Sequence, residues 1–282
     1  SDNLIVHIPF DDKVLSGSGE RIFMDFANGG VNALGSGNLH EHGNYKASCG
    51  GDITVNSASA VLGGAAVAPG VNDVNGKIQY QHCNFGASLT IAGWLKRHDQ
   101  GESAMVFTFQ GDEPDKHPDT GATLPDGAVG PPSAIGPDLW FGGNEIRWNT
   151  GDGSKNPFET RIGSGVKLVD DDLFPQGVWA HFALVNDLAS LTCSLFVNGV
   201  KAGEALYRNT TSTDSPFNIF GYQDTSYTYN LDGEIDEFRI YTGSLTNQQI
   251  QALYLQPNAG VGSTKIEGDQ ITTGKIKSNN FS

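Results

Sequence analysis

Residues 233–254, GEIDEFRIYTGSLTNQQIQALY, join a strand pattern to a helix pattern, and their interpretation decides the fold of this chain. The first half alternates polar and apolar residues with the period of two that is typical of a strand, so we expect a strand over residues 234–241. The second half predicts a short helix, with Thr246 as N-cap and Gln249 three residues later, as in a capping box. Pro257 is expected to end that helix.

Strand patterns recur along the rest of the chain. In residues 88–96, the odd positions from 89 to 95 fall on one face of a strand and Trp94 falls on the other. Asn198 followed by Gly199 predicts a type I′ turn that closes a hairpin. At least ten short strands and one terminal helix predict an all-β protein, a two-sheet antiparallel β-sandwich over residues 1–256.

The composition limits the function classes. The net charge of −15 repels phosphate backbones and anionic lipids, so we expect no nucleic-acid partner. No apolar run approaches the roughly 20 residues of a membrane helix, so we expect no membrane insertion. An acidic surface suits calcium and neutral sugars, although solubility alone explains it equally well.

The three cysteines, Cys49, Cys83 and Cys193, are odd in number and lack close spacing. This pattern argues against a disulfide framework and against a zinc site. We expect buried thiols, and a single bridge between Cys49 and Cys83 stays open. His181 lies beside Trp179 in a strand pattern and is expected to be a core histidine with its hydrogen bonds satisfied.

Residues 257–282 form a separate segment in which Ile266, Ile271, Ile276 and Phe281 are spaced five apart. The segment is too short and too polar to bury itself. Two interpretations stay open. It is either a disordered linker or an extended oligomerisation segment that packs against copies of itself or a neighbouring module.

Three stretches carry a family resemblance: SLTIAGWLK, GVWAHFALVNDLASLTCSLFVNGVKAG and LDGEIDEFRIYTGSLTNQQIQALY. Their order resembles the laminin-G-like, concanavalin A-like lectin/glucanase jelly-roll domain, over about residues 4–256. The matching positions are Trp94, residues 177–181, Asn198 with Gly199, and residues 233–237. The resemblance implies a jelly roll that serves as a binding module, often for carbohydrate and often with calcium at the rim of the sandwich. Protein adhesion and purely structural roles also occur in the family.

The end of the chain, GDQITTGKIKSNNF, resembles repeats in bacteriophage tail and host-recognition proteins. This resemblance implies a virion or an extracellular, cell-surface location, with a bacterial adhesin as the nearest rival. It also implies a homo-oligomer, expected to be a trimer, formed through or near residues 257–282.

The acids of the opening stretch invite comparison with a related jelly-roll family, the laminarinase-type glycoside hydrolases. Those enzymes carry Glu-x-Asp-x-x-Glu on one strand, and retaining hydrolysis needs two carboxyl groups roughly 5–5.5 Å apart. Here Glu234 and Asp236 fill the first two places, but Arg239 stands where the last acid belongs. We therefore expect a non-catalytic protein.

The alternation assigns Asp236 another role. It places Asp236 on one face with Phe238 and Ile240, which look like core, and turns Glu237 the other way, where it pairs with Arg239. A buried carboxylate must be hydrogen-bonded or metal-paired. Asp236 is therefore either a structural residue that bonds a turn or a calcium ligand.

Calcium needs six to eight oxygen ligands. Because first and last strands often pair in sandwiches, Asp11 and Asp25 are the expected partners of Asp236 in a metal site. Asp73 with its neighbouring asparagines, and residues 170–172, could also supply calcium ligands, although a run such as 170–172 is usually a solvated loop.

Sugar sites combine aromatic rings with side chains that hydrogen-bond hydroxyl groups. The loop GYQDTSYTYN, residues 221–230, and the hairpin over residues 139–148 supply both kinds. The predicted ligand-binding residues are Tyr222, Asp224, Tyr227, Tyr229, Trp140 and Arg147.

The sequence thus favours a non-catalytic module that recognises a cell-surface glycan or polysaccharide, as part of a phage tail or another host-binding surface protein. The alternative is a structural spacer or assembly domain that binds no sugar. A polysaccharide-cleaving enzyme is the third hypothesis.

Overall fold

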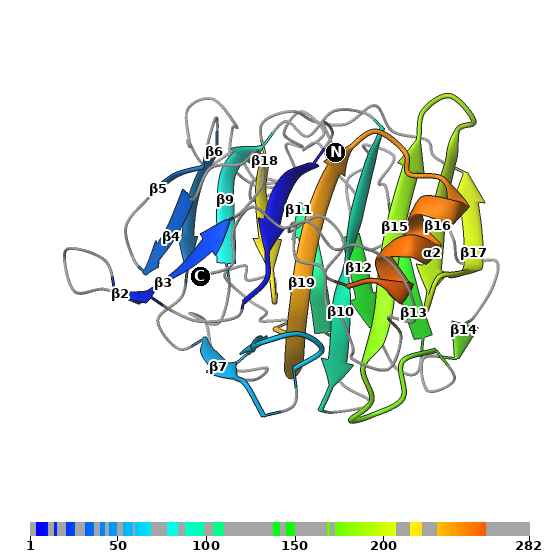
Figure 1. Ribbon diagram of the computed structural model, residues 1–282. Helices are drawn as coiled ribbons and strands as arrows, with labels where there is room; N and C mark the ends of the chain where they lie inside the picture. Colours follow the sequence, from blue (N-terminus) through cyan, green and yellow to red (C-terminus); the bar gives the residue numbers. More distant parts are fainter. Residues whose placement is uncertain are drawn as a thin grey trace, which may run out of the picture.

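The computed structural model describes residues 4–10, 14–15, 21–25, 32–36, 40–42, 45–49, 53–58, 60–68, 78–83, 88–98, 104–109, 138–141, 145–149, 168–169, 173–206, 215–221 and 230–257. Within these ranges the chain forms two β-sheets and a helix (Figure 1).

The first sheet has eight strands. In chain order they are β1 (Leu4–Ile8), β7 (Thr54–Asn56), β8 (Ala65–Val67), β10 (Leu89–Arg97), β15 (Ala180–Asp187), β16 (Thr192–Val197), β17 (Val200–Leu206) and β19 (Gly233–Thr242). They lie in the order β17-β16-β15-β10-β19-β8-β7, and β1 also pairs with β19. The expected pairing of the first and last strands is thereby confirmed.

The second sheet has eleven strands in the order β14-β13-β12-β11-β18-β9-β6-β4-β3-β2, with β5 paired to β6. They are β2 (Val14–Leu15), β3 (Arg21–Asp25), β4 (Asn32–Ser36), β5 (His40–His42), β6 (Tyr45–Cys49), β9 (Ile78–Cys83), β11 (Ala104–Phe109), β12 (Asp138–Phe141), β13 (Glu145–Asn149), β14 (Leu168–Val169) and β18 (Ser215–Ile219). Pairing is antiparallel apart from β4 with β6. The predicted two-sheet antiparallel sandwich is confirmed.

Aromatic side chains from both sheets meet in the core. Phe107 of the second sheet lies 5.9 Å from Phe182 of the first, measured between ring centroids. Phe217 and Phe238 approach across the same gap, with centroids 6.2 Å apart. All four rings are buried. Each aromatic side chain removes roughly 150–250 Å² from water, so this group holds the two sheets together.

Strand β10 has the alternation that the sequence predicts. Ile91 and Leu95 point into the core, and Trp94 lies on the outer face of the first sheet. Gly93 also faces the core, where a Cβ atom would lie 3.1 Å from the Phe182 ring. Glycine thus lets β10 approach the aromatic core closely.

Strand β19 departs from the alternation because it contains a bulge at Glu237, whose φ is 52°. Two residues of β19 face the single residue Gly93 of β10 there. A bulge shifts the alternation by one position. Asp236 therefore lies on the outer face, whereas Phe238 and Ile240 lie in the core. The expectation that these three residues share a face is wrong for that reason.

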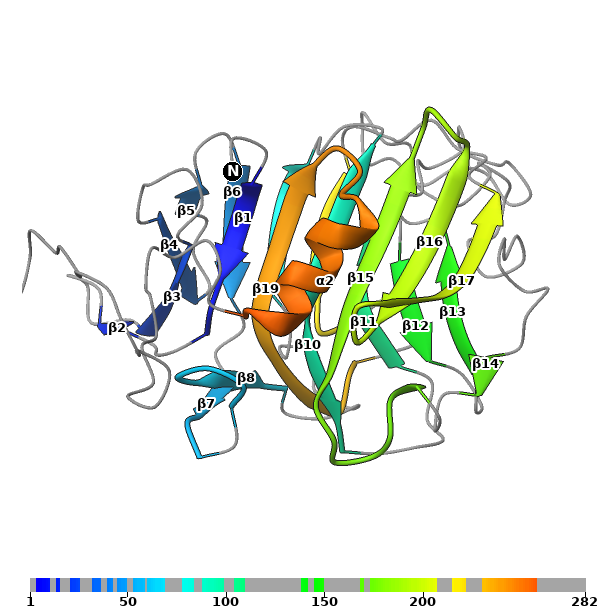
Figure 2. The same cartoon turned by 45° about the vertical axis from the view of Figure 1, so that its right-hand side comes forward.

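Helix α2 (Asn247–Leu255) covers the outer face of the first sheet (Figure 2). The Thr246 side chain accepts a hydrogen bond from the Gln249 backbone and the Gln249 side chain bonds back, so the predicted capping box is confirmed. Ile250 and Leu253 bury themselves against a second apolar cluster on the sheet. It contains Leu4, Ala92, Ala183, Val185, Phe196 and Tyr241. Within the described ranges, we find no helix with the length and hydropathy that a membrane span requires.

The predicted hairpin turn is also confirmed, because Asn198 and Gly199 have φ angles of 49° and 77°, as a type I′ turn requires.

Strand register excludes the disulfide between Cys49 and Cys83 that the sequence left possible. Cys49 pairs with Ile78, which places Cys83 five residues further along β9. At roughly 3.4 Å per residue the two lie about 17 Å apart, beyond the reach of a disulfide.

Candidate functional site

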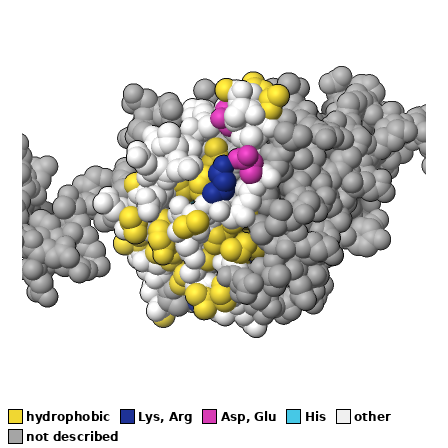
Figure 3. Space-filling model, turned by 90° about the vertical axis from the view of Figure 1, so that its right-hand side faces the viewer, with side chains coloured by type: hydrophobic (Ala, Val, Ile, Leu, Met, Phe, Trp, Pro, Cys, Tyr) yellow, Lys and Arg dark blue, Asp and Glu magenta, His cyan; other side chains and the backbone are white. Residues whose placement is uncertain are grey.

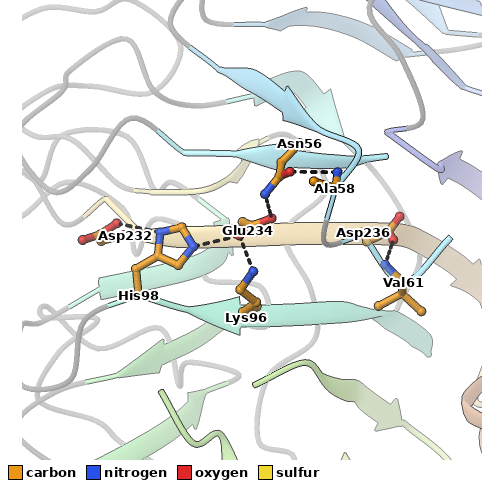
Figure 4. Close-up of polar contacts among 8 residues, drawn as sticks. All are labelled: Asn56, Ala58, Val61, Lys96, His98, Asp232, Glu234 and Asp236. Carbon is orange, nitrogen blue, oxygen red and sulfur yellow. Dashed lines mark hydrogen bonds and ion pairs between the residues drawn. The ribbon is translucent and has the colours of Figure 1, made fainter. Parts of the chain in front are cut away.

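The acids of the opening stretch lie in a row along β19, next to β10 and the segment that joins β7 to β8 (Figure 4). Alternation brings Glu234 and Asp236 to the outer face of the first sheet, opposite Lys96 and Trp94 of β10. Asp232 precedes the strand and is partly exposed. The contacts of each carboxylate decide what the row can do.

Glu234 is buried and has partners on both of its oxygens. Its Oε1 accepts from Lys96 Nζ at 2.6 Å and lies 2.9 Å from His98 Nε2. Its Oε2 accepts from Asn56 Nδ2 at 3.0 Å. His98 Nδ1 in turn lies 3.3 Å from an Asp232 oxygen. Charge-assisted hydrogen bonds on both oxygens fix the carboxylate in place, so Glu234 ties β19 to β10 and β7.

Asp236 binds the segment between β7 and β8. Its Oδ2 accepts hydrogen bonds from the backbone N–H groups of Val61 and Leu62, at 2.9 and 3.0 Å. Asn56 Oδ1 accepts from Ala58 N at 3.0 Å and bends the start of the same segment. Of the two roles left open by the sequence, the turn-bonding role is the one that these contacts support.

Burial raises the pKa of Asp236 to about 8 and outweighs the two backbone hydrogen bonds, which lower it. The nearby charge of Glu237 raises it further. Asp236 is therefore largely protonated in the folded protein at neutral pH.

Glu237 joins the two ends of the described chain. Its Oε2 accepts from Arg239 Nη2 at 2.5 Å and lies 2.8 Å from His7 Nε2 of β1. Arg239 Nη2 also donates to the backbone carbonyl of Pro257, which follows α2. The predicted pairing of Glu237 with Arg239 is confirmed. We call these four residues the terminal clasp.

His181 is buried on the outer face, beneath α2. Its ring lies 5.4 Å from that of Trp94 and 6.1 Å from that of Tyr254. Burial lowers the pKa of His181 to about 3, and the charge of Arg239 lowers it further. The expected burial is confirmed. Neither ring nitrogen has a hydrogen-bond partner within the protein.

The predicted tyrosine loop, with Tyr222, Asp224, Tyr227 and Tyr229, lies outside the described residues. The two ends of the loop, Gly221 and Asn230, are described, and they lie against each other. A Cβ atom at Gly221 would stand only 2.0 Å from Asn230 Oδ1, so this position accepts glycine alone without rearrangement.

The predicted ligand-binding residues Trp140 and Arg147 belong to β12 and β13, and the structure describes their backbone. They pair directly across β12 and β13, so both positions lie on one face of the second sheet. Leu139 and Phe141, which flank position 140, are buried in the core, and this places positions 140 and 147 on the opposite face.

Strand β11 separates the hairpin from the loop base. Met105 of β11 pairs with Trp140 on one side and forms a β-bridge with Asn230 on the other. The register therefore brings Asn230, at the base of the tyrosine loop, within two strand spacings of Trp140, about 10 Å.

The predicted metal ligands fare differently. Asp11 lies outside the described residues, as do Asp73 and residues 170–172. Asp25 ends β3 in the second sheet, whereas Asp236 belongs to the first. Within the described part of the chain there is no group of three or more His, Cys, Asp or Glu residues that could hold a metal ion.

Sequence reasoning did not single out Lys96, His98 or His7 as partners of the acids. For Lys96 and His98 a signal exists, because positions 94 and 96 share one face of β10 by the period of two, and His98 directly follows the strand in the same alternation. His7 meets Glu237 across 230 residues of sequence, and no local pattern predicts such a contact.

A comparison with protein families finds a match over residues 72–251 to the family described as the concanavalin A-like lectin/glucanases superfamily. The chain belongs to this superfamily. A comparison with curated proteins finds no match.

Among solved structures, the superfamily fold of this chain is similar to the binding domain of Paraclostridial Mosquitocidal Protein 1. The TM-score is 0.57 at 14% identity, covering 92% of this chain and 53% of that one. The binding domain of botulinum neurotoxin serotype D gives a TM-score of 0.56 at 11% identity, covering 92% and 52%. The chain thus spans about half the length of these two domains, and at such identity the likeness concerns the fold.

A third similar structure is domain 4 of AbnA, an extracellular arabinanase of family GH43 from Geobacillus stearothermophilus, solved in complex with arabinotriose. The TM-score is 0.51 at 18% identity, and the match covers 89% of this chain and 98% of that domain. The arabinanase domain and this chain therefore match over nearly their whole lengths.

Proposed function

We propose that this chain is a non-catalytic recognition module that binds a cell-surface glycan or polysaccharide. The observation that carries the proposal is the strand register of the second sheet. It sets Arg147, Trp140, Met105 and Asn230 in one row across neighbouring strands, with Asn230 at the base of the tyrosine loop. An aromatic ring stacks on the apolar face of a sugar, and guanidinium and carboxylate groups hydrogen-bond its hydroxyls.

The contacts of the acidic row support a non-catalytic role. Glu234, the residue in the nucleophile place of the laminarinase pattern, is held by Lys96, His98 and Asn56. Asp236 is held by two backbone N–H groups. Both carboxylates therefore act within the fold, and the binding surface is proposed on the other sheet.

The superfamily relatives support the ligand class. The arabinanase domain, which matches over its whole length, was solved with an arabinose oligosaccharide, and the toxin relatives are binding domains. We extend the proposal to an extracellular or virion surface, with residues 257–282 as the oligomerisation segment of a trimer. Of the predicted calcium ligands Asp11, Asp25 and Asp236, the contacts of Asp236 favour its structural role, so binding is not expected to require calcium.

The direct test is binding of the purified chain to a panel of neutral and acidic polysaccharides, with calcium and then with a chelator. For a glycan that binds, Trp140→Ala and Arg147→Ala should each weaken binding at least about tenfold, as expected for an aromatic or arginine anchor. Trp179→Ala, at the residue before β15, and Lys201→Ala, in β17, are matched controls away from the second sheet and should leave affinity unchanged. Equal losses of affinity in the control variants would place the ligand elsewhere. Loss of binding on addition of the chelator would show that calcium takes part in binding.

A structural spacer or assembly domain is the second candidate. It is favoured by exposed apolar side chains on the side of the molecule where β17 and α2 lie (Figure 3). Val200 is 69% exposed and Leu255 is 66% exposed. Gly199, next to Val200, packs on Tyr254, next to Leu255, so the start of β17 lies against α2. Exposed apolar surface often marks protein contacts. A solution mass of three times 30.0 kDa without binding to any glycan would favour this candidate.

A further inference from the structure

Five polar side chains gather on the outer face of the first sheet near α2, and we call them the α2 cluster. Its members are Trp94, His181, Asp236, Glu237 and Arg239. The last four are at most 1% exposed. Each member has at least one buried polar atom without a hydrogen-bond partner. These atoms are Trp94 Nε1, both ring nitrogens of His181, Asp236 Oδ1, Glu237 Oε1 and Arg239 Nε.

Strand register brings these residues together. Asp236, Trp94 and His181 are direct cross-strand neighbours in one row over β19, β10 and β15. Adjacent strands lie about 4.8 Å apart, so the row spans only about 10 Å. Arg239 stands opposite Ala92 in the following row, and the bulge places Glu237 between the two rows.

Other elements surround the cluster. The ring of Tyr254 in α2 lies 5.6 Å from that of Trp94. Arg239 reaches the carbonyl of Pro257 beyond the helix, and the backbone of Val61 and Leu62 covers Asp236. The cluster is thus enclosed by the sheet, the helix end and the segment between β7 and β8. Unpartnered polar atoms are costly in such surroundings, roughly 1–3 kcal/mol each.

The chemistry of the free atoms identifies the ligand that would satisfy them. Trp94 Nε1 and Arg239 Nε can only donate, whereas Glu237 Oε1 as a carboxylate oxygen can only accept. His181 supplies one donor and one acceptor in its neutral form, and Asp236 Oδ1 supplies one more site. Donors and acceptors therefore occur in nearly equal number.

A balanced set of donors and acceptors suits a small neutral molecule that can do both. A cation is disfavoured because Arg239 and His7 already surround Glu237 and because backbone N–H groups point at Asp236. An anion is disfavoured by the carboxylate of Glu237. We propose that the α2 cluster is a binding site for ordered water, about two molecules, which bridge sheet residues that have no direct partner.

The polar partners for such water lie close together. A water molecule needs about three polar partners. The row of Asp236, Trp94 and His181 supplies them within about 10 Å.

A crystal structure of the full chain at about 1.5 Å resolution tests the proposal. We expect solvent peaks about 2.7–3.2 Å from at least two of the unpartnered atoms. Direct pairing among the five side chains would overturn the proposal, as would a site without solvent peaks. A peak with oxygen ligands at about 2.3–2.6 Å would identify calcium and overturn it as well.

A variant gives a second readout in solution. Trp94→Phe removes the indole N–H, and Trp179→Phe on the same outer face is the control for lost ring volume. If Trp94 bonds water, the unfolding equilibrium constant of Trp94→Phe should rise about fivefold more than that of the control. If Nε1 truly lacks a partner, deleting it removes a desolvation cost. Equal or greater stability of Trp94→Phe would then contradict the proposal.

Discussion

Replacing His181 with Phe should remove much of the acid sensitivity of this fold. Burial holds the His181 imidazole neutral in the folded protein, with its pKa lowered from 6.5 to about 3. In the unfolded chain the same ring takes up a proton below its ordinary pKa. Because the unfolded state then binds more protons, folding stability is lost as the pH falls from 6.5 towards 3.

The size of the effect follows from the shift. Each pH unit between the two pKa values changes the free energy of unfolding by about 1.4 kcal/mol per group. Lowering the pH from about 7 to about 4 should therefore cost roughly 3 kcal/mol through His181 alone. A loss of this size is a large part of the 5–15 kcal/mol that is typical of a domain. No charged side chain on α2 compensates the protonated ring, since the helix sequence NQQIQALYL carries none.

Urea unfolding followed by tryptophan fluorescence, at about pH 7 and about pH 4, measures the effect in the wild type and in His181→Phe. The difference between the two proteins isolates His181 from the carboxylates that titrate in the same range. Phe retains an aromatic contact with Trp94, so the variant is expected to fold. His98→Gln is the control, because it removes a partly exposed imidazole and leaves His181 in place. The reasoning is refuted if wild type and His181→Phe lose equal stability between the two pH values.

Three further substitutions test other contacts. Asp236→Asn keeps an oxygen for the backbone N–H groups but cannot ionise. Because the folded pKa of Asp236 is raised from 3.8 to about 8, the folded state binds more protons in that interval, and the wild type should lose about 1.4 kcal/mol of stability per unit as the pH rises through it. Asp236→Asn should not show this loss, and urea unfolding curves at about pH 5 and about pH 8 measure the difference. Glu237→Ala leaves Arg239 as an uncompensated buried charge and should destabilise the protein by about 3–5 kcal/mol. Thermal unfolding measures this change, and a loss of stability below about 1 kcal/mol would show that the terminal clasp contributes little. Gly221→Ala brings a methyl group against Asn230 and should cost about 1–3 kcal/mol and weaken glycan binding together, whereas unchanged stability in calorimetry would show that the loop base is not closed.

The elements that the sequence predicts well are those whose pattern is local. The alternation around Trp94, the Asn198 and Gly199 turn, and the Thr246 cap each depend on neighbours within a few residues, and all three occur as expected. The two-sheet sandwich follows from many such signals in succession.

The bulge at Glu237 could not be predicted, because no glycine or asparagine marks the left-handed backbone there. One inserted residue moved Asp236 from the expected core face to the outer face and so changed its expected neighbours. The partners of the acids lie far away in sequence: Asn56, Lys96 and His98 all converge on Glu234. Such contacts depend on sheet order, which alternation does not specify. Four of the six predicted ligand-binding residues, Tyr222, Asp224, Tyr227 and Tyr229, lie outside the described ranges.

The terminal clasp has a mechanical consequence. His7 near one end of the described chain and Pro257 at the other are both held at residues 237–239 of a single strand. Tension applied between these ends would load the ladder between β1 and β19 and the salt bridge of Glu237, while the facing aromatic rings between the sheets would carry little of it. Under pulling, the outer strand and the helix should peel away first and leave the sandwich folded. The terminal clasp would then break before the sandwich does, so that the two sheets stay folded under force.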